Sequence, residues 1–201
     1  MDRLYRWTWC VVFIAILAVW GFAFFFWHFM SWLSPFIAPS LWIVVIAIAL
    51  VALGFSIVLP LRRWRVLRFA SLFPLIALTV VLVSSLYIDF TELWLDVNFA
   101  VGRSVRERIV RQVAAGDLRP NVDYNRSLIH LPARYHELSL GGGDIMIEGS
   151  KVFFFTYRGI LDNFAGFIYC PDDVPPVSGA FGGEFFIEKK MADRWYYVSA
   201  R

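Results

Sequence analysis

Few residues in this sequence could carry out chemistry, and the most reactive of them is the thiol of Cys170. A cysteine nucleophile needs a histidine to take its proton and a third group to orient that histidine. His130, His136, Asp172 and Asp173 supply these residue types, but their spacing matches no recognised catalytic arrangement. We therefore interpret Cys170 as a small structural side chain, with a thiol or hydrolytic enzyme as the alternative.

Other candidate ligand sites have weaker support in the sequence. The glycine run 141–143 lacks the Lys and Ser/Thr of a phosphate-binding loop and precedes a predicted strand, so it is interpreted as a turn. His130 and His136 lack the further Cys or His ligands of a structural zinc site. Asp162 and Asp172 do not follow the spacing of a calcium loop. We therefore expect no cofactor, no metal and no catalytic residue, and predict that the protein is not an enzyme.

Aromatic and polar side chains near the C-terminus form a candidate interaction surface instead. Large aromatic residues that are not needed for a core make effective anchors in protein interfaces. The polar segment between the aromatic stretches 152–157 and 164–169 supplies the other members of this candidate surface. The residues assigned to this surface are Trp195, Tyr196, Tyr197, Arg158, Asp162 and Asn163.

The elements that precede these residues begin with a long uncharged stretch. No Lys, Arg, Asp or Glu lies between Arg6 and Arg62, and a second uncharged stretch covers residues 69–88. A helix needs about 20 mainly apolar residues to cross roughly 30 Å of hydrocarbon. The chain is 59% hydrophobic, above the roughly 45–50% usual for soluble proteins. We predict a membrane anchor over residues 1–88 with three transmembrane helices, at 7–30, 41–59 and 69–88.

The placement of the arginines predicts the orientation of this anchor. Arg3 and Arg6 precede the first span, and the connection between the second and third spans carries Arg62, Arg63, Arg65 and Arg68. Basic connections are retained in the cytoplasm, so the N-terminus is expected there and the C-terminal domain in the periplasm or outside the cell. The same four arginines are candidate contacts for lipid headgroups, although a role in topology alone explains them. Arg103, Arg106 and Arg108 follow the last span and weakly oppose this orientation.

The remaining residues, 89–201, predict a small α+β domain with a mainly antiparallel sheet. Apolar residues recur at steps of three and four over 89–115, which is typical of a helix with one buried face. Arg103, Glu107 and Arg111 lie four residues apart on another face, which is interpreted as solvated. Aromatic and β-branched residues then predict six strands, at 127–131, 144–148, 152–157, 164–169, 184–189 and 195–199. Turn residues between them lead us to expect that consecutive strands pair. Residues 152–157 are apolar on both alternating faces, which predicts a central strand covered on one side by the preceding helix.

Charge narrows the range of partners. Six arginines and Asp2 give residues 1–88 a net charge of +5, whereas 13 basic and 15 acidic residues give the remainder −2. A nucleic-acid-binding domain is expected to be basic, so nucleic acid is not an expected partner. The expected partners are the lipid bilayer and a protein, which can be a second copy of this chain.

These expectations combine into a multi-pass protein of the cell inner membrane that presents a periplasmic interaction domain. Its roles would be those of an inhibitor, an immunity factor or a subunit of an envelope complex. Two alternatives remain open. One is the membrane-anchored enzyme that uses Cys170, and the other is a domain that faces the cytosol and signals as a sensor to the spans.

Overall fold

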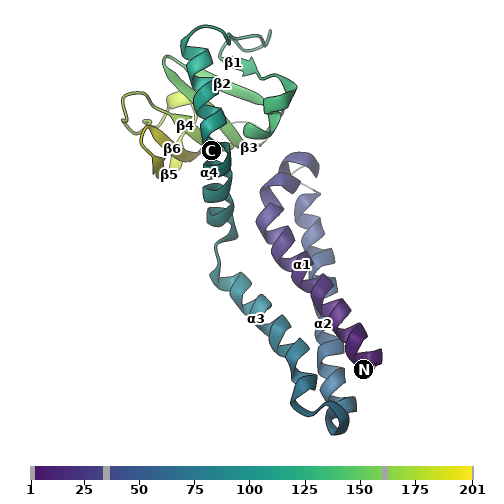
Figure 1. Cartoon of the computed structure of the whole chain (residues 1–201). Coiled ribbons are helices and arrows are strands. Elements are labelled where there is room, and N and C mark those ends of the chain that lie inside the picture. The colour runs from purple at the N-terminus through teal and green to yellow at the C-terminus, as the bar shows by residue number, and fades with distance from the viewer. Residues whose placement is uncertain (1–2, 34–36, 160–162, 201) are drawn as a thin grey trace. The chain divides into compact units, whose positions relative to one another are not determined.

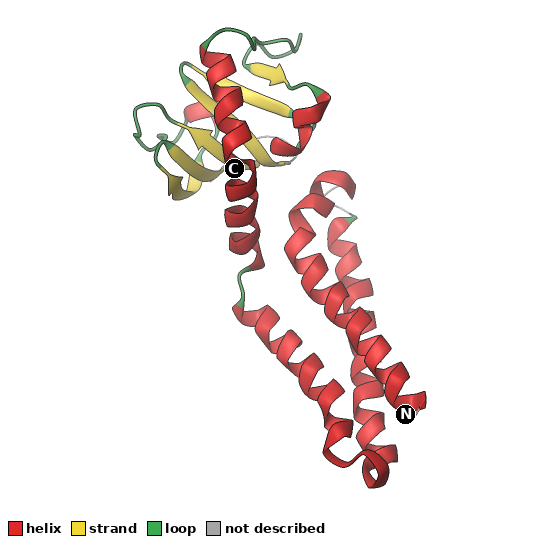
Figure 2. Cartoon of the chain, viewed as in Figure 1, coloured by secondary structure: helices red, strands yellow, loops and turns green. Residues whose placement is uncertain are grey.

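The computed structural model describes residues 3–33, 37–159 and 163–200. The chain divides into two compact units, Met1–Trp94 and Leu95–Arg201. The first unit is helical, and the second combines one long helix with a β-sheet (Figures 1 and 2). The helices of the first unit, in chain order, are α1 (Arg3–Leu33), α2 (Ala38–Leu67), the 3₁₀ segment η1 (Arg68–Leu72) and α3 (Phe73–Tyr87). Helix α4 (Phe90–Ala114) begins in the first unit and continues into the second.

Helices α1 and α2 run antiparallel and pack along a regular seam (Figure 1). The buried residues of this seam recur at alternating steps of four and three, which is the spacing of a heptad repeat. Several are small, and small side chains allow two helix backbones to approach closely. They are Thr8, Val12, Ala15, Val19 and Phe22 on α1, and Val45, Ala49, Ala52, Ser56 and Leu59 on α2.

Two stretches of the described chain are long and apolar enough to cross a membrane, judged by length and composition: Arg3–Phe26 and Ser40–Tyr87. The second stretch contains α2, η1 and α3, so the three separate spans expected from the sequence are not reproduced. The physical reason is that α2, η1 and α3 follow one another without a non-helical residue between them, so the second and third expected spans form one helical stretch of 48 residues. Helix α3 alone has 15 residues and is about 22 Å long, shorter than the roughly 30 Å of a hydrocarbon core.

The helical unit exposes a large apolar surface. Only 22% of the most hydrophobic window of each candidate span is buried, although the core helix of a soluble protein would be mostly buried. Each helix therefore packs through one stripe of its surface. Its other faces carry exposed aliphatic and aromatic side chains. Examples of the exposed residues are Phe13, Leu17, Ile43, Leu50, Val51, Val58, Val80 and Val83.

The second unit contains a six-stranded sheet in which every neighbouring pair is antiparallel, as expected from the sequence. Two short 3₁₀ segments, η2 (Ala133–Leu138) and η3 (Ala180–Gly182), lie in the connections. The strands are β1 (Leu128–His130), β2 (Asp144–Glu148), β3 (Lys151–Arg158), β4 (Phe164–Tyr169), β5 (Phe185–Ala192) and β6 (Trp195–Ala200).

The strand order is β1-β2-β3-β4-β6-β5, so β6 lies between β4 and β5. Sequence reasoning expected consecutive strands to pair, and this expectation fails for β4 and β5. Burial explains why β6, and not β5, lies beside β4, because Trp195 to Val198 of β6 are all buried and need neighbouring strands on both sides. Strand β5 carries Lys189 and Lys190, and charged residues are typical of a sheet edge.

Both faces of the sheet are covered. On one face, the ring of Phe99 from α4 lies 5.2 Å from the ring of Phe167 and 5.6 Å from that of Trp195. On the other face, Phe153 contacts Phe181 of η3 at a ring distance of 5.5 Å. Strand β3 is therefore interior to the sheet and lies under α4 on one side, as the apolar residues on both faces of 152–157 predicted.

Candidate functional site

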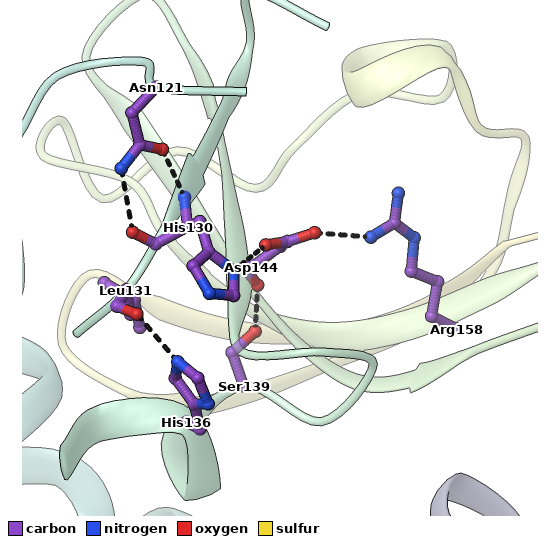
Figure 3. A network of polar contacts seen from close by, with 7 residues as sticks. All are labelled: Asn121, His130, Leu131, His136, Ser139, Asp144 and Arg158. Atoms are coloured by element: carbon purple, nitrogen blue, oxygen red, sulfur yellow. Dashed lines mark hydrogen bonds and ion pairs between the residues drawn. The ribbon is translucent and has the colours of Figure 1, made fainter. Parts of the chain in front are cut away.

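A buried carboxylate between two basic side chains is the most organised polar feature of the domain (Figure 3). Asp144 Oδ1 lies 2.8 Å from His130 Nδ1, and Asp144 Oδ2 accepts a hydrogen bond of 2.9 Å from Arg158 Nη1. The side chain of Asp144 is 10% exposed, whereas those of His130 and Arg158 are 52% and 33% exposed. The carboxylate therefore orients two groups that solvent or a partner can reach.

Strand pairing and two further polar side chains hold this network in place. His130 and Asp144 are direct partners in the β1–β2 register. Asn121 fixes the backbone of His130, because its amide donates to His130 O at 3.0 Å and accepts from His130 N at 2.7 Å. Buried Ser139 donates to the carbonyl of Asp144 and accepts from Phe155 N. Its hydroxyl is thus committed to the backbone and is not placed as a nucleophile.

His136 joins the site from η2. Its ring centroid is 4.9 Å from that of His130, and its Nε2 donates to the carbonyl of Leu131 at 2.8 Å. A turn of three glycines packs against the site, with positive φ values of 104°, 98° and 77° at residues 141 to 143. A Cβ on Gly143 would lie 2.6 Å from His136 Cγ, so a side chain there would displace the imidazole. The predicted turn therefore has a specific role, since it lets the backbone approach the site closely.

The arrangement can do two kinds of chemistry. A carboxylate that accepts the Nδ1 proton of a histidine leaves Nε2 to exchange a proton with a bound group. Alternatively, protonated His130 and Arg158 together would recognise an anionic group. Within the described residues, no set of three or more His, Cys, Asp or Glu side chains is placed to hold a metal ion.

The thiol of Cys170 is not part of this site. It is buried in the sheet core, and it follows the last residue of β4, whereas Arg158 pairs with Phe164 at the first residue of that strand. Six residues of strand span about 20 Å. The structure therefore does not bring Cys170 together with His130 or His136, and neither cysteine forms a disulfide.

Asp173 holds a second, exposed polar network at the other end of the sheet. It accepts hydrogen bonds of 2.6 Å from Lys190 Nζ and from the backbone N–H of Arg194, and its carbonyl accepts one of 2.7 Å from the hydroxyl of Tyr196. The bond from Lys190, followed by that from Arg194, lowers the pKa of Asp173 below its ordinary value of 3.8. The network ties the turn after β4 to the β5–β6 hairpin.

We expect the substitution Asp173→Asn to lower the thermal stability of the protein at neutral pH by a few degrees, with a difference that disappears in acid. Because folding lowers the pKa of Asp173, its contribution is present above pH 3.8 and is lost as the pH falls through the lowered pKa. Melting temperatures of wild type and variant at pH 7 and over a series of falling pH values measure this. Asp172→Asn, at the exposed neighbouring residue, is the matched control and should leave the melting temperature at pH 7 nearly unchanged.

The structure corrects the placement of the three predicted surface aromatics. Trp195, Tyr196 and Tyr197 are 1%, 3% and 7% exposed and belong to the core, because β6 is an interior strand with α4 on one face. Asn163 is exposed, and its carbonyl accepts from Gly159 N at 2.7 Å. Asp162 lies outside the described residues. Of the candidate surface, Arg158 and Asn163 therefore remain accessible.

The four arginines of the predicted basic connection lie at the junction of α2 and η1. Arg62, Arg63 and Arg65 are exposed on the last turns of α2, and Arg68 begins η1 with a φ of 46°. The first two contribute to a hollow in the helical unit, together with Arg3. The structure thus groups residues from the two ends of the α1–α2 hairpin.

Replacing Asp144, the central carboxylate of the network, should destabilise the domain. We expect Asp144→Ala to cost about 1–3 kcal/mol, the usual penalty for leaving buried polar partners unsatisfied. The buried thiol of Cys170 offers the measurement, because in a Cys10→Ser background its rate of alkylation reports opening of the domain core. His130→Ala removes a half-exposed ring and should change this rate much less. Equal effects of the two substitutions would argue against Asp144 as the organising residue.

The features above define a helical, externally apolar N-terminal unit followed by an α+β domain with an antiparallel sheet. No protein-family model matches the chain, and neither curated proteins nor solved structures gave a match. The function must therefore be argued from these residues themselves.

Proposed function

We propose that this protein is an integral protein of the cell inner membrane, whose helical unit lies in lipid and whose sheet domain binds another macromolecule. The observation that carries the proposal is the outward apolar surface of α1, α2 and α3. In water this surface would be a severe aggregation liability, whereas in hydrocarbon it is the favoured outer layer of a helix bundle.

Three crossings are the arrangement we favour, although α3 alone is short. The helical segment Arg68–Tyr87, formed by η1 and α3, has a combined length of about 30 Å. This length matches a hydrocarbon core, with Arg68 at the headgroup level. With the basic connection in the cytoplasm, the N-terminus is also cytoplasmic and the domain is periplasmic. A domain of reversed orientation, which would act as a cytosolic sensor, is supported by the basic residues Arg103 and Arg108 that follow α3.

The accessible His130–Asp144–Arg158 network is the surface that we assign to the partner. Its side chains are held in place by the sheet and by Asn121, and preorganised side chains lose little entropy on binding. The partner would be a protein, which includes a second copy of this chain, and the roles that fit are inhibitor, immunity factor or envelope-complex subunit. The net negative charge of residues 89–201 disfavours nucleic acid.

The membrane part is tested by extraction of cell membranes with alkaline carbonate. We expect the full-length protein to stay with the lipid pellet and to dissolve only in detergent. A reporter fused after Arg201, active in one compartment only, determines on which side the domain lies. Release of the intact protein by carbonate alone would overturn the proposal.

The binding part is tested by a photocrosslinking residue placed at Asn163, close to the network in sequence and exposed. We expect a discrete crosslinked adduct that mass spectrometry assigns to one protein. The matched control places the same crosslinker at Tyr124, which is 77% exposed in a different connection. Adducts from neither position, or the same adducts from both, would remove the support for a specific surface. The thiol-enzyme alternative is tested by Cys170→Ser, which would abolish the cellular phenotype only if the thiol reacts.

A further inference from the structure

A hollow in the helical unit is lined by residues from two distant parts of the sequence. Its volume is about 700 Å³, and its lining residues are Arg3, Leu4, Trp7, Arg62 and Arg63. The antiparallel packing of α1 and α2 accounts for the grouping, because the first turns of α1 lie beside the last turns of α2 (Figure 1). The hollow is thus a product of the fold, and the sequence cluster at 62–68 did not reveal the contribution of Arg3.

The lining of the hollow is strongly basic. It contains three guanidinium groups. Guanidinium groups bind phosphate oxygens through two parallel hydrogen bonds, which makes arginine a frequent phosphate ligand. Charge complementarity therefore points to a phosphate-bearing occupant.

The remaining lining residues add an apolar wall. Leu4 and Trp7 contribute it, and Trp7 is 66% exposed. Tryptophan prefers the level of the headgroups, where its ring contacts acyl chains while its N–H reaches polar groups. Farther along α1, Phe13 and Leu17 are also exposed. A ligand that satisfies both parts has a phosphate at one end and hydrocarbon at the other.

We propose that Arg3, Arg62 and Arg63 form a binding site for the phosphate of an anionic phospholipid, with Trp7 beside its acyl chains. The inference rests on the proposed membrane location of the helices. It goes beyond a general attraction to the membrane surface, because it assigns three particular arginines and leaves Arg65 and Arg68 outside the lining. Each basic residue near an anionic surface strengthens binding about fivefold, so three arginines that act independently would give about 100-fold. A preference of about tenfold is the smallest that the assignment predicts.

Native mass spectrometry of the full-length protein in neutral detergent tests this site. The probes are phosphatidylglycerol and phosphatidylcholine with identical acyl chains, added at equal concentration. We expect the wild-type protein to bind phosphatidylglycerol with about tenfold or greater preference. The triple variant R3Q/R62Q/R63Q should bind the two lipids within about twofold of each other. The triple variant R3K/R62K/R63K should keep part of the preference, which shows that the charge, and not a loss of folding, is responsible.

The matched control is R103Q/R108Q/R111Q, which removes the same number of charges from exposed positions on α4. It should retain the wild-type preference. Equal preferences in wild type and R3Q/R62Q/R63Q, or an equal loss in the α4 control, would overturn the assignment. Displacement of phosphatidylglycerol by millimolar inorganic phosphate would instead identify a site for free phosphate and would also overturn it. If carbonate extraction retains the protein in membranes and the arginines have no effect, this inference alone fails and the proposed membrane function stands.

Discussion

Replacing Arg106 with alanine is expected to increase the alkylation rate of Cys170 about 100-fold in the full-length Cys10→Ser protein. Arg106 is 1% exposed, its guanidinium lies 4.7 Å from the centre of the Phe167 ring, and it donates to the carbonyls of Asn98 and Leu138 and to the Asn98 side chain. Burial lowers the pKa of Arg106 below its ordinary value to about 10, so the side chain stays charged at neutral pH.

Two effects of opposite sign decide the magnitude. Removing the buried charge relieves the desolvation that lowers the pKa of Arg106, a penalty of roughly 3 kcal/mol. Against this, three acceptors lose their donor at about 1–3 kcal/mol each, and the loss of the stem adds a cavity. The net cost of Arg106→Ala is therefore about 3 kcal/mol, and each 1.4 kcal/mol is a factor of ten.

Arg103 provides the matched control, since it lies on the same helix with a side chain that is 45% exposed and paired with Glu107. An exposed pair of this kind contributes less than about 1 kcal/mol. Arg103→Ala should therefore change the alkylation rate by about fivefold at most. Equal rates for Arg106→Ala and Arg103→Ala would show that the buried guanidinium is not a structural link between α4 and η2.

Replacing Trp195 with alanine is expected to destabilise the domain by about 3–5 kcal/mol, the usual cost of truncating a buried Trp or Phe. Its indole packs between Phe99 of α4 and the rings of Phe154 and Tyr169. The alkylation rate of Cys170 should rise by about two to nearly four orders of magnitude, which also distinguishes a core residue from an interface anchor.

Tyr124→Ala, at an exposed aromatic residue of the same domain, serves as the comparison and should leave the rate nearly unchanged. If Trp195 instead anchored a partner, its substitution would weaken crosslinking from Asn163 and leave Cys170 protected. That outcome would restore the interpretation made from the sequence.

The sequence predicted the elements of the domain well, because its signals are local. The alternation and aromatic content of 152–157 and 164–169 predict strands, and the three- and four-residue steps over 89–115 predict a helix that the structure places at Phe90–Ala114. Strand order is a non-local property. The position of β6 between β4 and β5 follows from burial of Trp195 on both sides, which no local pattern specifies.

The candidate site was only partly accessible to sequence reasoning for the same reason. His130, His136 and Arg158 were each singled out, but their common partner Asp144 was assigned only to a strand. Its position directly opposite His130 depends on the β1–β2 register. Arg106 entered the sequence argument only as a charge near the membrane. Gly102, whose missing Cβ leaves room for that guanidinium, is a sequence signal that could have pointed to its burial.

The two outer strands of the sheet restrict how a partner can bind. At one side, β1 has only three residues, and at the other, β5 carries Lys189 and Lys190 and shifts register twice along its pairing with β6. Neither presents a long, regular row of backbone donors and acceptors, so docking of an added strand from another chain is disfavoured at both. A partner bound at the proposed surface would then be contacted by side chains and connecting loops, and not by an extension of the backbone ladder.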